Sequence, residues 1–324
     1  MIAASRQPVQ IIAGNAHPEL ARALAGELGV SLTSTDVGAF ADGETRVHID
    51  GDVRHANVFI VQPTCPPVND NLMVLALLAD AAHGAGAARV TAVVPYFGYA
   101  RQEQRSRPGD ACSARVAARL LQSVGIDHLI TLDLHAPALE SALPMPATLL
   151  RAEKLFLPQL QTGAAKNLVV VSPDAGGLKR AQRYAAALGA SLAIVAKERP
   201  RPDAAAPLQV LGDVQERPCL VVDDMASTGR TLHGAADALH RAGASVIDAV
   251  FTHAVMAPEA AERLSSTGFG RVLTSDSIPV ENAPWLEVVS IAPLLALTVR
   301  HLCGEATVSA DLGIVWSSPK AGSV

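Results

Sequence analysis

Two adjacent carboxylates, Asp223 and Asp224, end the apolar run CLVV and precede a turn rich in small residues. The turn consists of Ser227, Thr228, Gly229, Arg230 and Thr231, and a segment with helical spacing follows it. Successive backbone N–H groups at a helix N-terminus form a cradle for an anion, and hydroxyl groups add donors. Carboxylates beside this cradle can accept hydrogen bonds from vicinal hydroxyls, so the segment indicates binding of a phosphorylated sugar. The alternative is an ordinary strand-to-helix turn in which Asp and Ser only cap the helix.

Two further polar residues follow apolar runs. His135 comes after HLITLDL, and Asp174 ends NLVVVSPD directly before Gly176 and Gly177. A histidine beside a phosphate site can hold Mg²⁺ directly or through water, although Mg²⁺ prefers oxygen ligands. The glycines after Asp174 allow the backbone to approach a ligand closely. The alternative for His135 is a structural histidine that binds nothing.

The elements that must position these residues alternate along nearly the whole chain. Short β-branched runs are separated by Ala/Leu-rich helical segments, a pattern typical of βαβ units around a buried parallel sheet. Prolines break the rhythm near residues 145–165, so we expect two domains, residues 1-148 and 149-324. With about five strands in each half, the pattern predicts an α/β fold of two similar doubly wound lobes with parallel central sheets. Ligands of such sheets bind beyond the carboxyl ends of the strands, where the polar residues lie. The last helical segment, APLLALTVRHL, could pack on the first lobe.

The composition excludes several classes of protein. Of 324 residues, 49% are hydrophobic and 18% are charged, which is not the composition of a disordered chain. No apolar stretch reaches the roughly 18 residues of a membrane span, and no secretory signal is visible. The net charge of −5 gives no bulk attraction to nucleic acid or to an acidic membrane. We therefore expect a soluble, cytoplasmic protein with no nucleic-acid or membrane partner.

The turn at residues 223–231 resembles the phosphoribosyl-diphosphate loop of the type I phosphoribosyltransferase fold. This likeness alone leaves open the transferases that consume phosphoribosyl diphosphate and the synthase that makes it. Five further segments decide between them: FADGETRVHI, VVPYFGYARQEQR, TLDLHA, VVSPDAGGLKRA and AKERPRPD. In this order they resemble the ribose-phosphate pyrophosphokinase (phosphoribosyl diphosphate synthase) family. The resemblance covers about residues 9–312, and the transferases have no counterpart to the first-lobe segments.

The resemblance implies transfer of the diphosphoryl group of ATP to the anomeric hydroxyl of ribose 5-phosphate, with Mg²⁺ as cofactor. The first lobe would bind ATP, the second ribose 5-phosphate, and the protein would be a homo-oligomer, either a dimer or a hexamer. Lys197 and Arg199 would be catalytic, and His135 and Asp174 would be linked to magnesium. The implied ATP-binding residues are Phe40, Asp42, Gly43, Glu44, Arg101 and Gln102. Those for ribose 5-phosphate are Asp223, Asp224, Ser227, Thr228, Gly229, Arg230 and Thr231.

The residue types fit these roles. Diphosphoryl transfer depends on positioning and on neutralising the charge that develops on oxygen. Lys197 and Arg199 lie two residues apart in a Pro-rich, extended segment, so both point the same way and suit a clamp on a phosphoryl chain. Arg101 and Gln102 offer a guanidinium and an amide to the nucleotide, and the family likeness brings the Phe40 turn to the adenine from a neighbouring subunit. Without the resemblance, solvated loops at both places remain the alternatives.

Four positions depart from the commonest bacterial form of the family. Gln104 and Glu198 stand where that form has arginine, Ser227 where it has aspartate, and Arg230 where it has glycine. The STG turn and RPGDACSARVAARLL resemble the archaeal-type branch, but Arg230 fits neither branch. The altered turn leaves a second hypothesis: a non-catalytic or regulatory paralogue that binds nucleotide or an active synthase subunit.

Overall fold

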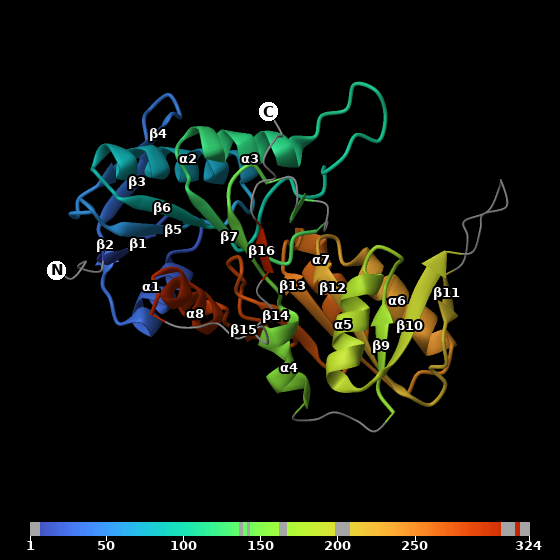
Figure 1. The fold of residues 1–324 in the computed structure, drawn as a ribbon. Coiled ribbons are helices and arrows are strands. Elements are labelled where there is room, and N and C mark those ends of the chain that lie inside the picture. Colours follow the sequence, from blue (N-terminus) through green and yellow to red (C-terminus); the bar gives the residue numbers. More distant parts are fainter. Residues whose placement is uncertain are drawn as a thin grey trace. The chain divides into compact units, whose positions relative to one another are not determined.

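The computed structural model describes residues 7–135, 139–140, 143–161, 167–197, 208–305 and 315–317. They form two compact units (Figure 1). Unit 1 holds the described residues up to Arg151, Ser277–Pro279, and those from Ile291 onward, whereas unit 2 holds those of Ala152–Asp276 and Val280–Ser290.

Unit 1 contains a mostly parallel sheet of seven strands in the order β16-β8-β7-β6-β5-β1-β2, in which only β16 is antiparallel to its neighbour. The chain runs from β1 to β2 on one side and resumes with β5 on the other, so the direction of winding switches between β1 and β5. The strands β3 and β4 form a separate antiparallel hairpin. The elements of unit 1 are β1 (Val9–Ala13), α1 (Pro18–Leu28), β2 (Leu32–Thr33), β3 (Thr35–Ala39), β4 (Thr45–Ile49), β5 (Asn57–Val61), α2 (Val68–Gly84), β6 (Arg89–Val93), α3 (Ser113–Ser123), β7 (His128–Leu132), β8 (Ala147–Leu150), α8 (Ala292–Leu302) and β16 (Val315–Ser317).

Unit 2 repeats this plan with the strand order β11-β10-β9-β12-β13-β14-β15, in which only β11 is antiparallel to its neighbour. Here the winding switches between β9 and β12. Helix α5 covers one face of the sheet, and α6 and α7 cover the other (Figure 1). The elements of unit 2 are α4 (Glu153–Gln161), β9 (Val169–Ser172), α5 (Leu178–Leu188), β10 (Ser191–Lys197), β11 (Leu208–Leu211), β12 (Pro218–Met225), α6 (Arg230–Arg241), β13 (Val246–His253), α7 (Pro258–Ser265), β14 (Val272–Ser275) and β15 (Glu287–Val289).

The cores have the apolar character that a doubly covered sheet requires. All five residues of β7 and all four of β9 are buried, as expected for parallel strands with helices on both faces. Helix α8 belongs to unit 1, where it packs on α1 and where Arg300 donates a hydrogen bond to the backbone oxygen of Glu27. None of the helices in the described residues has the length and apolarity that a membrane crossing requires.

The predicted α/β architecture of two doubly wound lobes is confirmed. Each sheet has seven strands instead of about five, because short edge strands carry little of the apolar pattern on which the prediction relies. The Pro-containing segment near residues 145–165 contains β8 and the whole of α4, with Pro158 inside the helix. The two units separate between Arg151 and Ala152, because β8 pairs with β7 and stays with unit 1.

Candidate functional site

The connection from β12 to α6 holds the acid pair and the turn. Asp223 and Asp224 lie in the last residues of β12, and Gly229 is the N-cap of α6 with a φ of 70°. A side chain is unfavourable at this left-handed φ, so the turn has glycine where the backbone requires it. Arg230 is the first residue of α6 and is exposed. The arginine therefore lies one residue beyond the left-handed position.

Helix α7 braces this turn. The backbone N–H of Ala257 donates to the oxygen of Ser227 at 2.8 Å, and Nη1 of Arg263 donates to the oxygen of Thr228. A Cβ atom on Gly229 would lie 3.2 Å from Cγ of Leu264. Among the described residues no side chain caps α6, and first-turn N–H groups of a helix need a partner from outside the helix. The backbone oxygens of Ser227 and Thr228 are thus bound by groups of α7, and the N–H groups at the start of α6 are the donors that could bind an anion.

The acid pair is nearly buried and faces an arginine. The side chains of Asp223 and Asp224 are 12% and 6% exposed, and Nη1 of Arg180 lies 3.5 Å and 3.4 Å from their Oδ1 atoms. Burial raises the pKa of Asp223 well above its ordinary value; the charge of Asp224 adds to the rise, and Arg180 opposes it. The site therefore favours contacts that compensate a buried negative charge, such as hydroxyl donors.

The loop after β9 lies on the other side of the switch point. Oδ1 of Asp174 accepts a hydrogen bond from the N–H of Gly177 at 2.9 Å, and Oγ of Ser172 donates to the Asp174 backbone oxygen at 2.7 Å. A Cβ atom on Gly177 would lie 2.9 Å from Oγ of Ser172, closer than a side chain tolerates. The loop thus holds the Asp174 carboxylate in one orientation while leaving it exposed.

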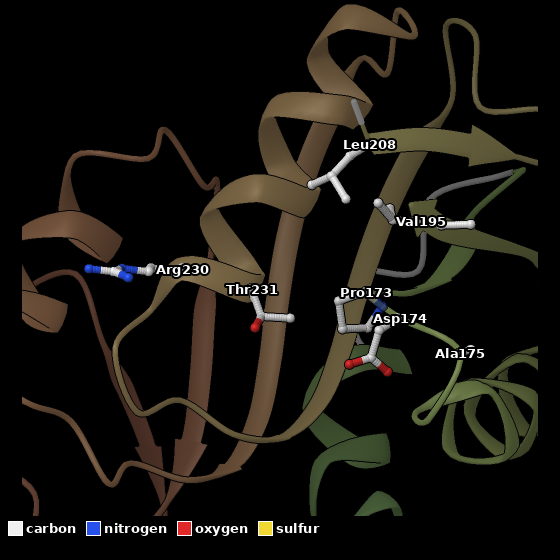
Figure 2. A pocket seen from close by; sticks show the side chains of 8 residues that line it. Pro173, Asp174, Ala175, Val195, Leu208, Arg230 and Thr231 are labelled. Carbon is white, nitrogen blue, oxygen red and sulfur yellow. The ribbon is translucent and has the colours of Figure 1, made fainter. Parts of the chain in front are cut away.

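A cavity of about 590 Å³ opens beside the loop after β9 and the start of α6 (Figure 2). Figure 2 shows the Asp174 carboxylate and the Thr231 hydroxyl on two sides of the cavity, and the Arg230 side chain extending away from Asp174. Lys197 ends β10 directly after the lining residue Ala196, and Arg199 lies outside the described residues. The lining residues are Pro173, Asp174, Ala175, Val195, Ala196, Leu208, Arg230 and Thr231.

In unit 1 the turn between β3 and β4 carries four of the predicted site residues. The Phe40 N–H donates to the Glu44 oxygen at 2.8 Å, and the Gly43 N–H donates to the Phe40 oxygen at 3.0 Å. Oδ1 of Asp42 accepts from the Glu44 N–H at 3.1 Å, and Gly43 has a φ of 93°. The Phe40 ring is 55% exposed on this rigid turn, a position suited to stacking on a planar ligand.

The loop after β6 carries Arg101 and Gln102, whose side chains are both exposed. The Gln102 N–H donates to the Tyr99 oxygen at 2.9 Å, and the Gln102 Oε1 accepts from Oγ of Ser113 at 2.5 Å. The Gly98 N–H donates to the Thr64 hydroxyl at 2.7 Å, which anchors the start of the loop. The loop is therefore held by backbone and hydroxyl contacts, and the side chain of Arg101 is exposed.

His135 follows β7 and is exposed, whereas Asp133 is buried, with a φ of 38° and its N–H bonded to the Leu150 oxygen at 3.0 Å. His135 belongs to unit 1 and Asp174 to unit 2. The described residues contain no group of three or more His, Cys, Asp or Glu that could bind a metal ion.

No motif in the sequence indicates Arg180 or Arg263, which contact the acid pair and the turn. Arg180 lies within the quoted segment VVSPDAGGLKRA, but nothing in its spacing indicates that α5 places it against β12. The contact of Arg263 likewise depends on how α7 packs.

Two doubly wound domains with a carboxylate-and-hydroxyl turn at a switch point define a protein of the phosphoribosyltransferase fold. The "N-terminal domain of ribose phosphate pyrophosphokinase" matches residues 9–125, and the "phosphoribosyl transferase domain" matches residues 140–282. The chain belongs to the ribose-phosphate pyrophosphokinase family.

Similar proteins are found along nearly the full length. The ribose-phosphate pyrophosphokinase of Neisseria meningitidis is 42% identical over 94% of this chain and 95% of its own. That of Marinomonas sp. is 41% identical over 94% and 99%. The crystal structure of phosphoribosylpyrophosphate synthetase from Mycobacterium smegmatis superposes with a TM-score of 0.87, at 35% identity over 93% of this chain and 100% of that one.

Proposed function

We propose that this chain is an active ribose-phosphate diphosphokinase, which transfers the diphosphoryl group of ATP to the anomeric hydroxyl of ribose 5-phosphate and releases AMP. The observation that carries the proposal is the switch point of unit 2, where a buried acid pair adjoins a hydroxyl-rich turn and an uncapped helix N-terminus. The names of the relatives, over nearly the whole chain, agree with it.

Ribose 5-phosphate would bind at this turn. Asp223 and Asp224 would accept hydrogen bonds from ribose hydroxyls, because carboxylates are strong acceptors for hydroxyl donors. The phosphate would be bound by N–H groups at the start of α6 and by the hydroxyls of Ser227, Thr228 and Thr231. Arg230 adds a cation at the rim without occupying the left-handed position of Gly229.

ATP would bind to unit 1 through Arg101 and Gln102, with the exposed Phe40 turn completing the site of a neighbouring copy. A ring that is 55% exposed on a rigid hairpin suits contact with the adenine of another subunit. Asp42, Gly43 and Glu44 would shape this hairpin. The proposal therefore includes a homo-oligomer, either a dimer or a hexamer.

The residues present fit Mg²⁺. This ion usually keeps several waters and takes one or two carboxylates together with substrate phosphates, so it needs no larger protein cluster. Asp174 offers an exposed carboxylate oriented by the Gly177 N–H. The link of His135, in unit 1, to the same ion is implied by the family resemblance alone. When bound, Mg²⁺ would neutralise phosphate charge, while Lys197 and Arg199 would stabilise the negative charge that develops on the transferred group.

Some finer predictions remain proposals. The relatives reported above are bacterial and give no support to an archaeal-type affiliation, so only the local likeness of the STG turn is retained. The division into an ATP lobe at residues 1-148 and a ribose 5-phosphate lobe at residues 149-324 stays a prediction, as does a cytoplasmic location.

The direct test is AMP release by the purified protein. We expect AMP to form from ATP only when both ribose 5-phosphate and Mg²⁺ are present, together with an equal amount of phosphoribosyl diphosphate. Binding of nucleotide without AMP release under any of these conditions would contradict the proposal and favour the regulatory paralogue.

A further inference from the structure

Arg180 occupies a central place at the switch point of unit 2. Its Nη1 atom bridges the Oδ1 atoms of Asp223 and Asp224 at 3.5 Å and 3.4 Å, and its side chain is 11% exposed. The same Nη1 atom would lie 3.7 Å from a Cβ atom on Gly177, the N-cap of α5, so the guanidinium lies close to the end of the loop that carries Asp174. Arg180 thus links the start of α5 to the end of β12.

The position of Arg180 in its own helix does not explain this placement. Arg180 lies in the first turn of α5, which has no acidic residue there. A cation near a helix N-terminus opposes the helix dipole instead of complementing it. The two carboxyl groups at the end of β12 compensate the charge of Arg180. The arginine therefore interacts more favourably with the acid pair than with the dipole of its own helix.

Arg180 is one of the groups that hold the acid pair, and the Oδ1 atom of Asp223 also accepts a hydrogen bond from the Asp224 N–H at 2.8 Å. Two adjacent carboxyl groups that are 12% and 6% exposed disfavour negative charge on each other, and burial raises the pKa of Asp223, a rise that Arg180 opposes. A protonated carboxyl has less capacity to accept hydrogen bonds than a carboxylate. Because Arg180 contacts the Oδ1 atom of each group, it also limits rotation of both carboxylate planes.

We propose that Arg180 is a positioning residue of the ribose site, which orients the carboxyl groups of Asp223 and Asp224 to accept hydrogen bonds from the sugar hydroxyls. This inference rests on the proposed function, since it assigns Arg180 to the ribose 5-phosphate site of the same reaction. It acts through the acid pair and need not contact the sugar.

The test compares Arg180→Met with Arg180→Lys and Arg183→Met. Arg183 is a matched control because it lies on the same helix and forms a partly buried ion pair at 2.7 Å with Glu153 instead of with the acid pair. We expect Arg180→Met to raise the KM for ribose 5-phosphate at least about tenfold, with the KM for ATP changed less than about threefold. Arg180→Lys should recover most of the loss, and Arg183→Met should leave both constants unchanged.

Calorimetric titration with ribose 5-phosphate, and circular dichroism to check folding, should accompany the kinetics. An unchanged KM and affinity for ribose 5-phosphate in Arg180→Met, or equal changes for both substrates, would overturn the inference. Wild-type protein that binds ribose 5-phosphate but releases no AMP would refute the proposed activity alone, and the titrations would still test Arg180. Wild-type protein that neither binds nor reacts would overturn both.

Discussion

Replacing Gly229 by alanine tests whether the turn before α6 is built as the site requires. Gly229 has a φ of 70°, and an added Cβ atom would lie 3.2 Å from Cγ of Leu264 and 3.4 Å from the backbone oxygen of Ala260. The left-handed conformation costs an alanine roughly 1–2 kcal/mol, and the close contacts add to this because a backbone oxygen in α7 cannot move freely. We therefore expect Gly229→Ala to destabilise the protein by about 2 kcal/mol.

The same substitution should impair binding of ribose 5-phosphate. Relieving the contacts with α7 requires the turn to shift, which would weaken one or two hydrogen bonds to the phosphate. The expected rise in KM for ribose 5-phosphate is roughly tenfold, with the KM for ATP little changed. Steady-state kinetics with each substrate varied in turn, together with thermal unfolding, measures both effects.

Gly189→Ala is the matched control for Gly229→Ala. Gly189 is the C-cap of α5, has a similar φ of 61°, and has no atom within 4 Å of an added Cβ atom. It should show the cost of the left-handed conformation, about 1–2 kcal/mol, with unchanged kinetics. The reasoning would be refuted if Gly229→Ala bound ribose 5-phosphate as well as wild type, or if both variants changed KM alike.

Five further substitutions probe other residues of the chain. Lys197→Ala and Arg199→Ala should each lower kcat more than about tenfold with little change in nucleotide affinity, because these cations act on charge developing in the transition state. Near wild-type turnover in either variant would contradict this catalytic assignment. Arg230→Gly should stay active and raise the KM for ribose 5-phosphate by less than about tenfold; activity that appears only in the glycine variant would favour the regulatory paralogue. Phe40→Ala should weaken ATP binding in a titration, and mixing Phe40→Ala with Lys197→Ala subunits should restore some activity. A fully active monomer would refute an ATP site that is shared between subunits. Burial lowers the pKa of His128 from 6.5 to about 4, so the unfolded chain binds one more proton than the folded chain between these pH values. The free energy of unfolding therefore falls as the pH drops through this range. Denaturant unfolding should show a loss of about 2 kcal/mol in this free energy from pH 7 to pH 5, and His128→Gln should abolish the loss.

Local patterns in the sequence predict most of the elements. The segments of α5 and α6 have clear helical periodicity with apolar residues on one side, and β7 and β9 are short apolar runs between turns. Local patterns miss β8 and α4, because Pro144 and Pro146 precede the strand and Pro158 argues against a helix. Both elements owe their conformation to packing on neighbours that are distant in the sequence.

The sequence predicts the loops of the site better than the groups that support them. Asp223, Asp224 and Asp174 are visible because charged residues at the ends of apolar runs are unusual. Arg180 is not, because its contact with the acid pair depends on the pairing of β9 with β12 and on the packing of α5 across both strands. Such a contact between distant parts of the chain leaves no periodic or local signal.

A comparison of the two switch points explains why the fold alone does not assign the ribose site. In unit 1 the loops after β1 and β5 are joined by the fully buried Gln62, whose Oε1 accepts from the Ala16 N–H at 3.0 Å and whose Nε2 donates to Oδ1 of Asn15 at 3.1 Å. A neutral amide satisfies these groups without a ligand. In unit 2 the corresponding loops bring two carboxyl groups to one arginine, which leaves carboxyl oxygens as acceptors for hydroxyl donors. The chemistry of the loop side chains, and not the strand order that both units share, therefore favours unit 2 as the sugar-binding unit.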